Sequence, residues 1–250
     1  MVFEEKLGLE LTRYLGLHFF TSQYFAPHQI VTHLFMHGNM MHIFSNMFAL
    51  WMFGNVLENV WGGKRFLIYY LVTGIGAALI HTGFSWYDIH NMQQSVDLFM
   101  NQASPMDFKM LVEKYHGYLR HDDIGALNEL LGAWSNMPND PKLMAEARSF
   151  AQELVTRKED IPTVGASGAV FGVLLAFGML FPNTVLYLYF AFPIKAKWFV
   201  FFYGMFELYS GIQNNPGDNV AHFAHLGGML FGYIMIKNWN KNRFKNYGDF

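Results

Sequence analysis

The stretch Gly165-Ala166-Ser167-Gly168 opens an apolar run that continues without a charged residue to Phe181. Such a run is typical of a membrane-spanning helix, in which every backbone amide is paired within the segment because hydrocarbon offers no partner. The serine stands between small residues at the start of this run rather than in its middle. The stretch therefore indicates a membrane protein with a hydroxyl placed near the end of a span.

The composition of the whole chain agrees with a bilayer environment. Of the 250 residues, 52% are hydrophobic and 14% are charged, fewer charges than a soluble domain usually carries. The net charge of −2, with no clustered basic face, argues against a nucleic-acid partner. The chain has no cysteine, which excludes disulfides, thiolate metal sites and a cysteine nucleophile.

Five segments are predicted to be spanning helices from their length and apolar character. They are Met40 to Trp61, Phe66 to Phe84, Val164 to Phe181, Trp198 to Ile212 and Val220 to Trp239. Two shorter apolar pieces, Thr12 to Phe25 and Val185 to Pro193, are interrupted by polar residues or proline and favour interfacial or re-entrant structure. The chain is thus predicted to be an all-α polytopic membrane protein.

Cationic residues near the span ends predict the orientation, because Lys and Arg stay on the cytoplasmic side. They cluster in three places: Lys64 and Arg65, Lys195 and Lys197, and Lys237, Lys241, Arg243 and Lys245. Alternating loops put all three clusters on one face and residues 85–162 on the other. This polar insert holds seven Lys or Arg against twelve Asp or Glu, which suits the extracytoplasmic side.

The insert, 85–162, separates two core parts, 1–84 and 163–250. Ser104-Pro105, Asp123 and Asp140-Pro141 are typical of helix starts, so we expect a small helical subdomain. The predicted orientation leaves residues 1–39 outside the membrane with no span to deliver them. We therefore expect a preceding helix, of which Met1-Val2-Phe3 would be the last turn.

Three polar motifs lie at the extracytoplasmic ends of predicted spans, where ionisable groups need a functional reason. The motifs are HGNMMHIFSN at 37–46, GASG at 165–168 and AHFAHLGG at 221–228. A serine hydroxyl becomes a good nucleophile when an imidazole takes its proton, and His225 is the candidate base for Ser167. His42 and Asn46, spaced i, i+4 on one helical face, are candidate donors to an oxyanion, together with the Ser167 backbone N–H.

These motifs, in this order, resemble the signature of the rhomboid intramembrane serine proteases. The resemblance covers roughly residues 27–239, with the insert as an interruption. It implies a rhomboid-like helical bundle whose first family span is missing or truncated here, and an enzyme that cleaves transmembrane protein substrates within the lipid bilayer. No cofactor or metal is implied, and the expected location is a bacterial inner membrane with the active site facing the extracytoplasmic side.

The resemblance also implies roles for individual residues. Ser167 would be the nucleophile and His225 the general base, preferred over His222 because Gly228 and Gly232 follow it at +3 and +7. His42 and Asn46 would be the oxyanion donors. Four glycines would allow close helix contact: Gly165, Gly168, Gly228 and Gly232. Glu58 resembles the family's buried glutamate that braces the first loop.

Alternatives to these interpretations remain open at the level of sequence. Ser167 taken alone favours a helix-packing contact, and a solvated helix end near Lys64 explains Glu58 nearly as well as a brace does. The several histidines allow a metal or haem protein, although no HExxH motif is present. His33 and His222 are interpreted as plain polar residues at the membrane interface. A catalytically inactive rhomboid-like protein that binds membrane clients would have the same fold and is a further alternative.

Overall fold

A computed structural model describes residues 10–188, 191–213 and 220–245, with side chains up to residue 239. The Met1-Val2-Phe3 segment lies outside the described residues. The elements are α2 (Leu11–Leu15), α3 (Gln29–Thr32), η1 (His33–Phe35), α4 (Met40–Ala49), η2 (Leu50–Gly54), α5 (Asn55–Trp61), α6 (Gly63–Asn101), α7 (Pro105–Lys114), η3 (His116–Tyr118), α8 (His121–Asn136), α9 (Pro141–Glu159), α10 (Ser167–Leu180), β1 (Val185–Leu188), β2 (Phe192–Lys195), α11 (Ala196–Gln213) and α12 (His222–Lys245).

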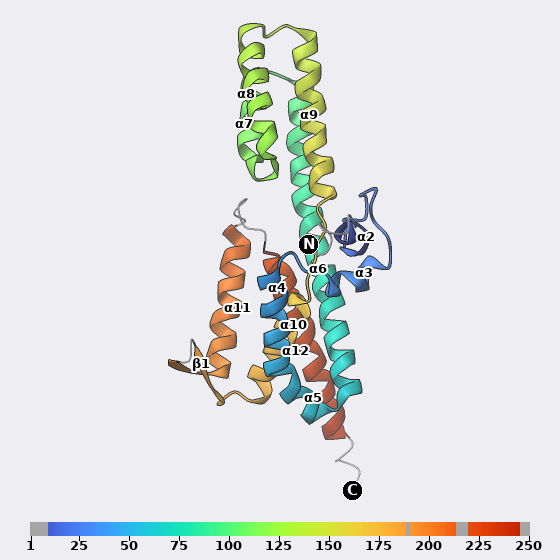
Figure 1. The fold of residues 1–250 in the computed structure, drawn as a ribbon, viewed down its shortest axis with the longest axis vertical. Helices are drawn as coiled ribbons and strands as arrows, with labels where there is room; N and C mark the ends of the chain where they lie inside the picture. Colours follow the sequence, from blue (N-terminus) through green and yellow to red (C-terminus); the bar gives the residue numbers. More distant parts are fainter. Residues whose placement is uncertain (1–9, 189–190, 214–219, 246–250) are drawn as a thin grey trace.

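A single long helix, α6, joins the two parts of the molecule (Figure 1). Its first half belongs to a bundle with α4, α10 and α12, and its second half rises out of this bundle beside α9. The helix passes residue 85 without interruption, so the polar insert begins inside a helix rather than at a loop. The insert is therefore connected to the core bundle through one continuous helix.

The core bundle is built around α10. Ten of its fourteen residues are buried, because it lies among α6, α11 and α12. The Tyr69 hydroxyl of α6 donates a hydrogen bond of 2.7 Å to the Gly172 carbonyl of α10. A helix surrounded on all sides is apolar all round, which explains why the segment after Ser167 carries no charge.

The insert is a helical subdomain, and two of its three expected helix starts are confirmed. The Ser104 hydroxyl accepts from the Asp107 N–H at 3.2 Å and caps α7, and Asp140 caps α9 by accepting from the Lys142 N–H at 2.8 Å. Asp123 is not the cap of α8; it lies three residues inside and accepts from the Arg120 N–H at 2.6 Å. Trp134 and Phe108 are fully buried in the centre of this subdomain.

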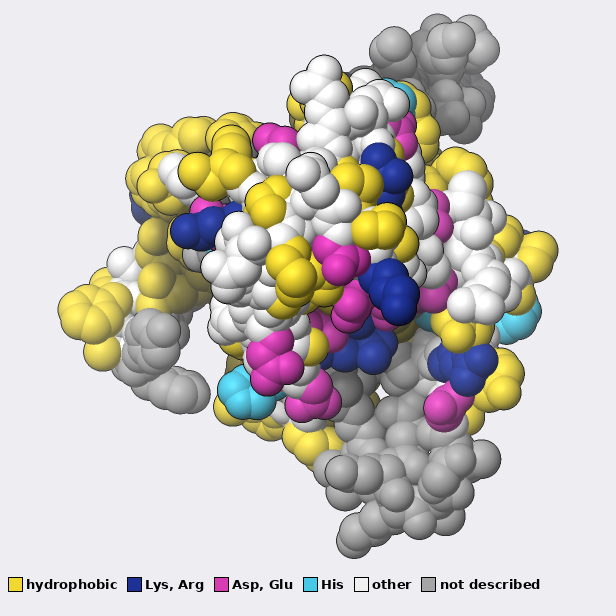
Figure 2. Space-filling view, turned by 90° about the horizontal axis from the view of Figure 1, so that it is seen from above, with side chains coloured by type: hydrophobic (Ala, Val, Ile, Leu, Met, Phe, Trp, Pro, Cys, Tyr) yellow, Lys and Arg dark blue, Asp and Glu magenta, His cyan; other side chains and the backbone are white. Residues whose placement is uncertain are grey.

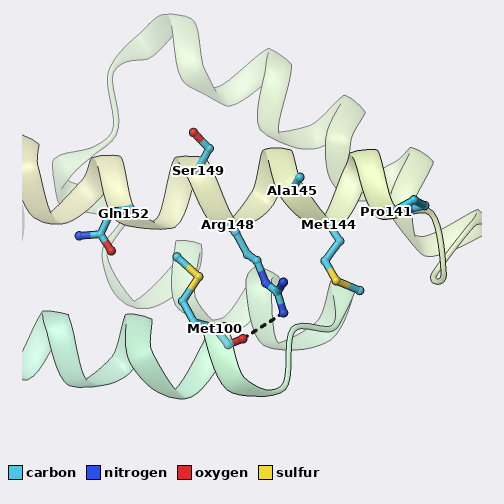
Figure 3. A pocket seen from close by; sticks show the side chains of 7 residues that line it. All are labelled: Met100, Pro141, Met144, Ala145, Arg148, Ser149 and Gln152. Carbon is cyan, nitrogen blue, oxygen red and sulfur yellow. Dashed lines mark hydrogen bonds between the residues drawn. The ribbon is translucent and has the colours of Figure 1, made fainter.

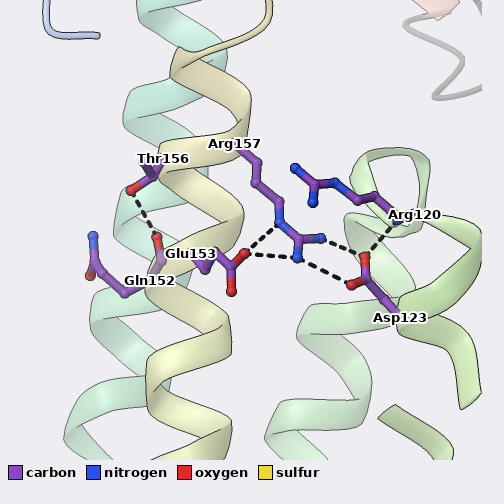
Figure 4. A network of polar contacts seen from close by, with 6 residues as sticks. All are labelled: Arg120, Asp123, Gln152, Glu153, Thr156 and Arg157. Atoms are coloured by element: carbon purple, nitrogen blue, oxygen red, sulfur yellow. Dashed lines mark hydrogen bonds and ion pairs between the residues drawn. The ribbon is translucent and has the colours of Figure 1, made fainter. Parts of the chain in front are cut away.

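An ion pair joins α8 to α9 inside the insert (Figure 4). The Arg157 guanidinium donates to both carboxylate oxygens of Asp123, at 2.5 and 3.1 Å, and both side chains are largely buried. The hydrogen bonds from Arg157 hold the pKa of Asp123 below its ordinary value. A carboxylate paired in this way adds stability when it is ionised.

We expect Asp123→Asn to lower the stability of the insert by about 1–3 kcal/mol near neutral pH, because the charged partner of Arg157 is lost. Since the pKa of folded Asp123 is lowered, its contribution is complete above the unfolded-state value near 4 and is lost as pH falls through the folded-state value. Thermal unfolding of the full chain in detergent, followed by tryptophan fluorescence between pH 7 and 3, measures both effects. Asp122→Asn, at the exposed neighbouring position, serves as control, and equal losses in the two variants would contradict the assignment.

The N-terminal segment packs where α9 leads into α10. The Thr21 hydroxyl donates to Glu159 at 2.6 Å and Ser22 to Asp160 at 2.7 Å. Leu17 and Thr163 form a short antiparallel bridge. The seven residues between α9 and α10 are thus tied to the N-terminal segment along their length.

The surface of the core bundle is strongly apolar, whereas polar and charged side chains gather over the insert when the molecule is seen from that end (Figure 2). Large apolar side chains exposed on α4, η2 and α11 include Phe44, Phe48, Trp51, Phe201, Phe202 and Phe206. Water does not favour so large an exposed apolar surface, but hydrocarbon does. The beginnings of α6 and α11 and the end of α12 lie together at the end away from the insert (Figure 1).

Length and hydropathy support two of the five predicted spans among the described residues. These are Met40–Trp61 and the helix Gly63–Asn101. The segment at Val164 forms the shorter helix α10 of 14 residues. Polar side chains such as Glu207 in α11 and His225 in α12 lower the mean hydropathy of the last two segments. The piece at Val185 forms a hairpin in which β1 pairs antiparallel with β2.

Candidate active site

Ser167 is the first residue of α10, at the end of the bundle that faces the insert. The preceding loop requires glycine at position 165, whose φ of +124° is strained for other residues. The Gly165 N–H donates to the His33 carbonyl at 3.0 Å, which fixes the loop. The Ser167 N–H, at a helix N-terminus, is not used by the first turn of α10.

His225 lies directly against this serine. Its Nε2 is 2.9 Å from the Ser167 Oγ, a hydrogen-bond distance between residues that are far apart in the sequence. The imidazole stacks on the Phe171 ring of α10, with ring centres 4.1 Å apart and planes 5° from parallel. The imidazole and the hydroxyl are therefore in contact.

Glycines allow the two helices to come this close. A Cβ added at Gly228 would collide with the Gly168 carbonyl oxygen, and one added at Gly232 would collide with the Tyr69 hydroxyl. Gly168 also faces the Ala77 methyl group of α6. The backbones of α10 and α12 are thus in contact directly after Ser167 and about one turn after His225.

The predicted oxyanion residues lie on α4 beside the same loop. A Cβ added at Gly165 would meet the His42 Nε2 at 2.9 Å and the Ser167 Oγ at 3.6 Å, so that glycine lies between the two side chains. The Gly38 N–H donates to the His42 Nδ1 at 3.4 Å, which leaves the Nε2 as the protonated donor. Asn46 is buried, and its Nδ2 has no hydrogen-bond partner among the described residues. Both groups have a donor available for an incoming carbonyl oxygen.

Glu207 of α11 is a further member of the cluster that the sequence analysis did not single out. Its side chain is buried, and its Oε2 is 2.8 Å from the His225 Nδ1 and 2.6 Å from the His222 Nδ1. The signal was present, since an acidic residue within a largely apolar segment is a functional candidate by default. Its partners were not evident because they depend on how α11 and α12 face each other.

Three residues lie in other surroundings than the sequence predicts. His222 is not a plain interfacial residue, because it is buried and bound to Glu207. His33 is likewise buried, with its Nδ1 2.9 Å from the Gln29 carbonyl. Glu58 is exposed, and therefore does not match a buried brace of the first loop; its position near the end of α5 fits the alternative of a solvated helix end.

A metal site would need a carboxylate near the histidines, and Glu207 provides one. Glu207, His222 and His225 offer ligand atoms that all lie within 4.8 Å of one another. The carboxylate oxygen is, however, at hydrogen-bond distance from both imidazoles, and the second nitrogen of His225 contacts Ser167. The three groups thus satisfy one another as a hydrogen-bonded set that ends on a serine.

A separate open pocket lies on the insert, between the end of α6 and α9 (Figure 3). Arg148 reaches across it and donates to the Met100 carbonyl at 3.0 Å. The lining residues are Met100, Pro141, Met144, Ala145, Arg148, Ser149 and Gln152. None of them belongs to the serine and histidine cluster.

Comparisons with known proteins identify the family of the chain. A family model described as the Rhomboid domain matches residues 24–90 and 142–238 and leaves out the middle of the insert. The chain is 25% identical over 220 residues to RHOMBOID-like protein 12, mitochondrial, of Arabidopsis thaliana, covering 87% of this chain and 48% of that protein. It is 42% identical over 55 residues to Rhomboid-like protein 11, chloroplastic, of the same plant, covering 22% of this chain and 20% of that protein. No solved structure gives a significant match.

The chain thus spans about half the length of the first of these relatives and a fifth of the second. Their names place them in mitochondria and chloroplasts. These locations do not fit the expected bacterial inner membrane, which therefore has no support beyond the sequence.

Proposed function

The chain belongs to the rhomboid family of membrane proteins, and from this premise we propose that it is an intramembrane serine endopeptidase that cleaves transmembrane protein substrates. The observation that carries the proposal is the 2.9 Å contact between the Ser167 Oγ and the His225 Nε2. Retention of both groups in contact speaks against the inactive, client-binding alternative.

The chemistry proceeds through an acyl-enzyme. The Ser167 Oγ attacks the scissile carbonyl carbon while its proton passes to the His225 Nε2, and the carbonyl electron pair becomes an oxyanion. The Ser167 N–H, the Asn46 amide and the His42 Nε2–H stabilise this charge. His225 then gives its proton to the leaving amine as the C–N bond breaks. Water, activated by the same imidazole, releases the acyl group and restores Ser167.

The proposed orientation follows from the charged residues. Lys64, Arg65, Lys195 and Lys197 lie near the beginnings of α6 and α11, at the end away from the insert. With these cations on the side where positive residues are retained, the acidic insert and the Ser167 end of the bundle face the opposite compartment. Substrates would then be cut near the membrane surface on the insert side.

Labelling of membranes with a fluorescent fluorophosphonate tests the proposal. The reagent forms a covalent bond only with an activated serine, so we expect a labelled band for the wild-type chain and none for Ser167→Ala. Circular dichroism and gel filtration of both purified proteins control for folding. An unlabelled wild type, or equal labelling of the two proteins, would refute the assignment and favour the client-binding role.

A further inference from the structure

Glu207 stands out among the buried groups because the proton transfer from Ser167 to His225 does not use it directly. It is the only acidic residue of α11, and its side chain is 4% exposed. An ionised carboxylate in apolar surroundings is costly unless it is paired and hydrogen-bonded. Its retention at this depth requires a compensating interaction, and the two histidines of α12 supply it.

The hydrogen bonds to Glu207 determine which nitrogen of His225 carries the proton. A carboxylate only accepts hydrogen bonds, so the His225 Nδ1, at 2.8 Å from the Oε2, must be the donor. In the neutral imidazole the lone pair then lies on the Nε2, the atom that faces the Ser167 Oγ. This is the tautomer that can take the serine proton.

We propose that Glu207 is a positioning residue that completes a Ser167–His225–Glu207 triad, an inference that rests on the proposed protease function. The carboxylate holds the imidazole in the productive tautomer and orientation. It also stabilises the imidazolium that forms when the Ser167 proton reaches the Nε2, and it keeps its own negative charge throughout. The ring stacking with Phe171 fixes the imidazole plane, and Glu207 fixes its rotation within that plane.

His222 supports the carboxylate rather than the serine. Its Nδ1 lies 2.6 Å from the same Oε2, so two N–H groups converge on one oxygen. This second hydrogen bond holds the carboxylate toward α12 and offsets part of the cost of its burial. Glu207 thus links both histidines of the AHFAHLGG motif to the neighbouring helix.

The test compares purified full-length wild type, Glu207→Gln and Glu207→Asp in proteoliposomes with a transmembrane substrate. Glutamine keeps the shape but removes the charge, and its amide can select the wrong tautomer of His225. We expect kcat to fall by about 10²–10⁴-fold with KM within about threefold. Glu207→Asp keeps the charge and should recover part of the loss. Glu129→Gln, the same change at an exposed position of the insert, should match wild type.

A kcat for Glu207→Gln within about threefold of wild type would overturn the triad while leaving the protease assignment intact, since fluorophosphonate labelling tests Ser167 and His225 separately. Should the Gln variant fail to fold, ¹⁵N chemical shifts of histidine-labelled wild-type protein decide the matter. The proposal requires a His225 imidazole protonated at Nδ1. An imidazole protonated at Nε2 would refute it whether or not the protein cleaves a substrate.

Discussion

Replacing His225 by alanine is expected to lower the rate of substrate cleavage at least about a thousandfold, because the imidazole in contact with the Ser167 hydroxyl is then missing. Replacing His222 is expected to cost far less, about tenfold or below. His222 contacts Glu207, and in its absence His225 keeps both the carboxylate and the serine. The measurement is turnover of a transmembrane substrate by each purified variant in proteoliposomes.

The comparison of the two histidines distinguishes a catalytic base from a supporting residue. Both lie on the first two turns of α12, both are buried, and both bind the same carboxylate oxygen. A general effect of losing a buried imidazole would therefore be similar at the two positions. Equal loss of activity in His222→Ala and His225→Ala, with both proteins folded by circular dichroism, would contradict the assignment of His225 as the base.

Gly228→Val is expected to separate α10 from α12 and to destabilise the protein by about 3 kcal/mol or more. Even the first added carbon would collide with the Gly168 carbonyl oxygen. This oxygen belongs to the backbone of α10 and moves only if the helix moves. Because Gly168 follows Ser167 directly, the displacement would also break the contact with His225, so activity should fall at least about a hundredfold.

Gly83→Ala is the matched control for this prediction. Gly83 also lies inside a helix, but a Cβ added there meets no atom within 4 Å. Alanine should be neutral or stabilise the helix by up to about 1 kcal/mol. Thermal unfolding in detergent and substrate turnover measure both variants. Wild-type stability and activity in Gly228→Val would show that the close approach of the two helices is not required.

The residues at the centre of this site could be singled out from the sequence, because polar residues of these types are uncommon in apolar segments. Ser167, His225, His42 and Asn46 stood out for that reason, and the structure gathers them at one end of the bundle. Their roles remain predictions until variants are measured. Gly228 could be predicted from its spacing to Gly232, since small residues four apart allow helices to touch.

The partners of Glu207, the exposure of Glu58 and the number of spans could not be predicted, because they depend on how the helices pack and where they end. Glu207 was visible as an acid in an apolar run, but its pairing depends on the rotation of α11 against α12. The family resemblance favours Glu58 as a buried brace, but sequence does not show which face of a helix is covered, and the Glu58 side chain is exposed. Five spans were expected, whereas two helices among the described residues meet the length and hydropathy of a span. The helix α10 is too short, with 14 residues, and polar side chains lower the hydropathy of α11 and α12.

The loop between α9 and α10 is short and is attached to the N-terminal segment. Only seven residues separate the last turn of α9 from the nucleophile, and they are clamped at Leu17 and at the His33 carbonyl. The helix α9 packs along the continuous helix α6, so a displacement of α9 along α6 would be transmitted to Ser167 through a loop with few free residues.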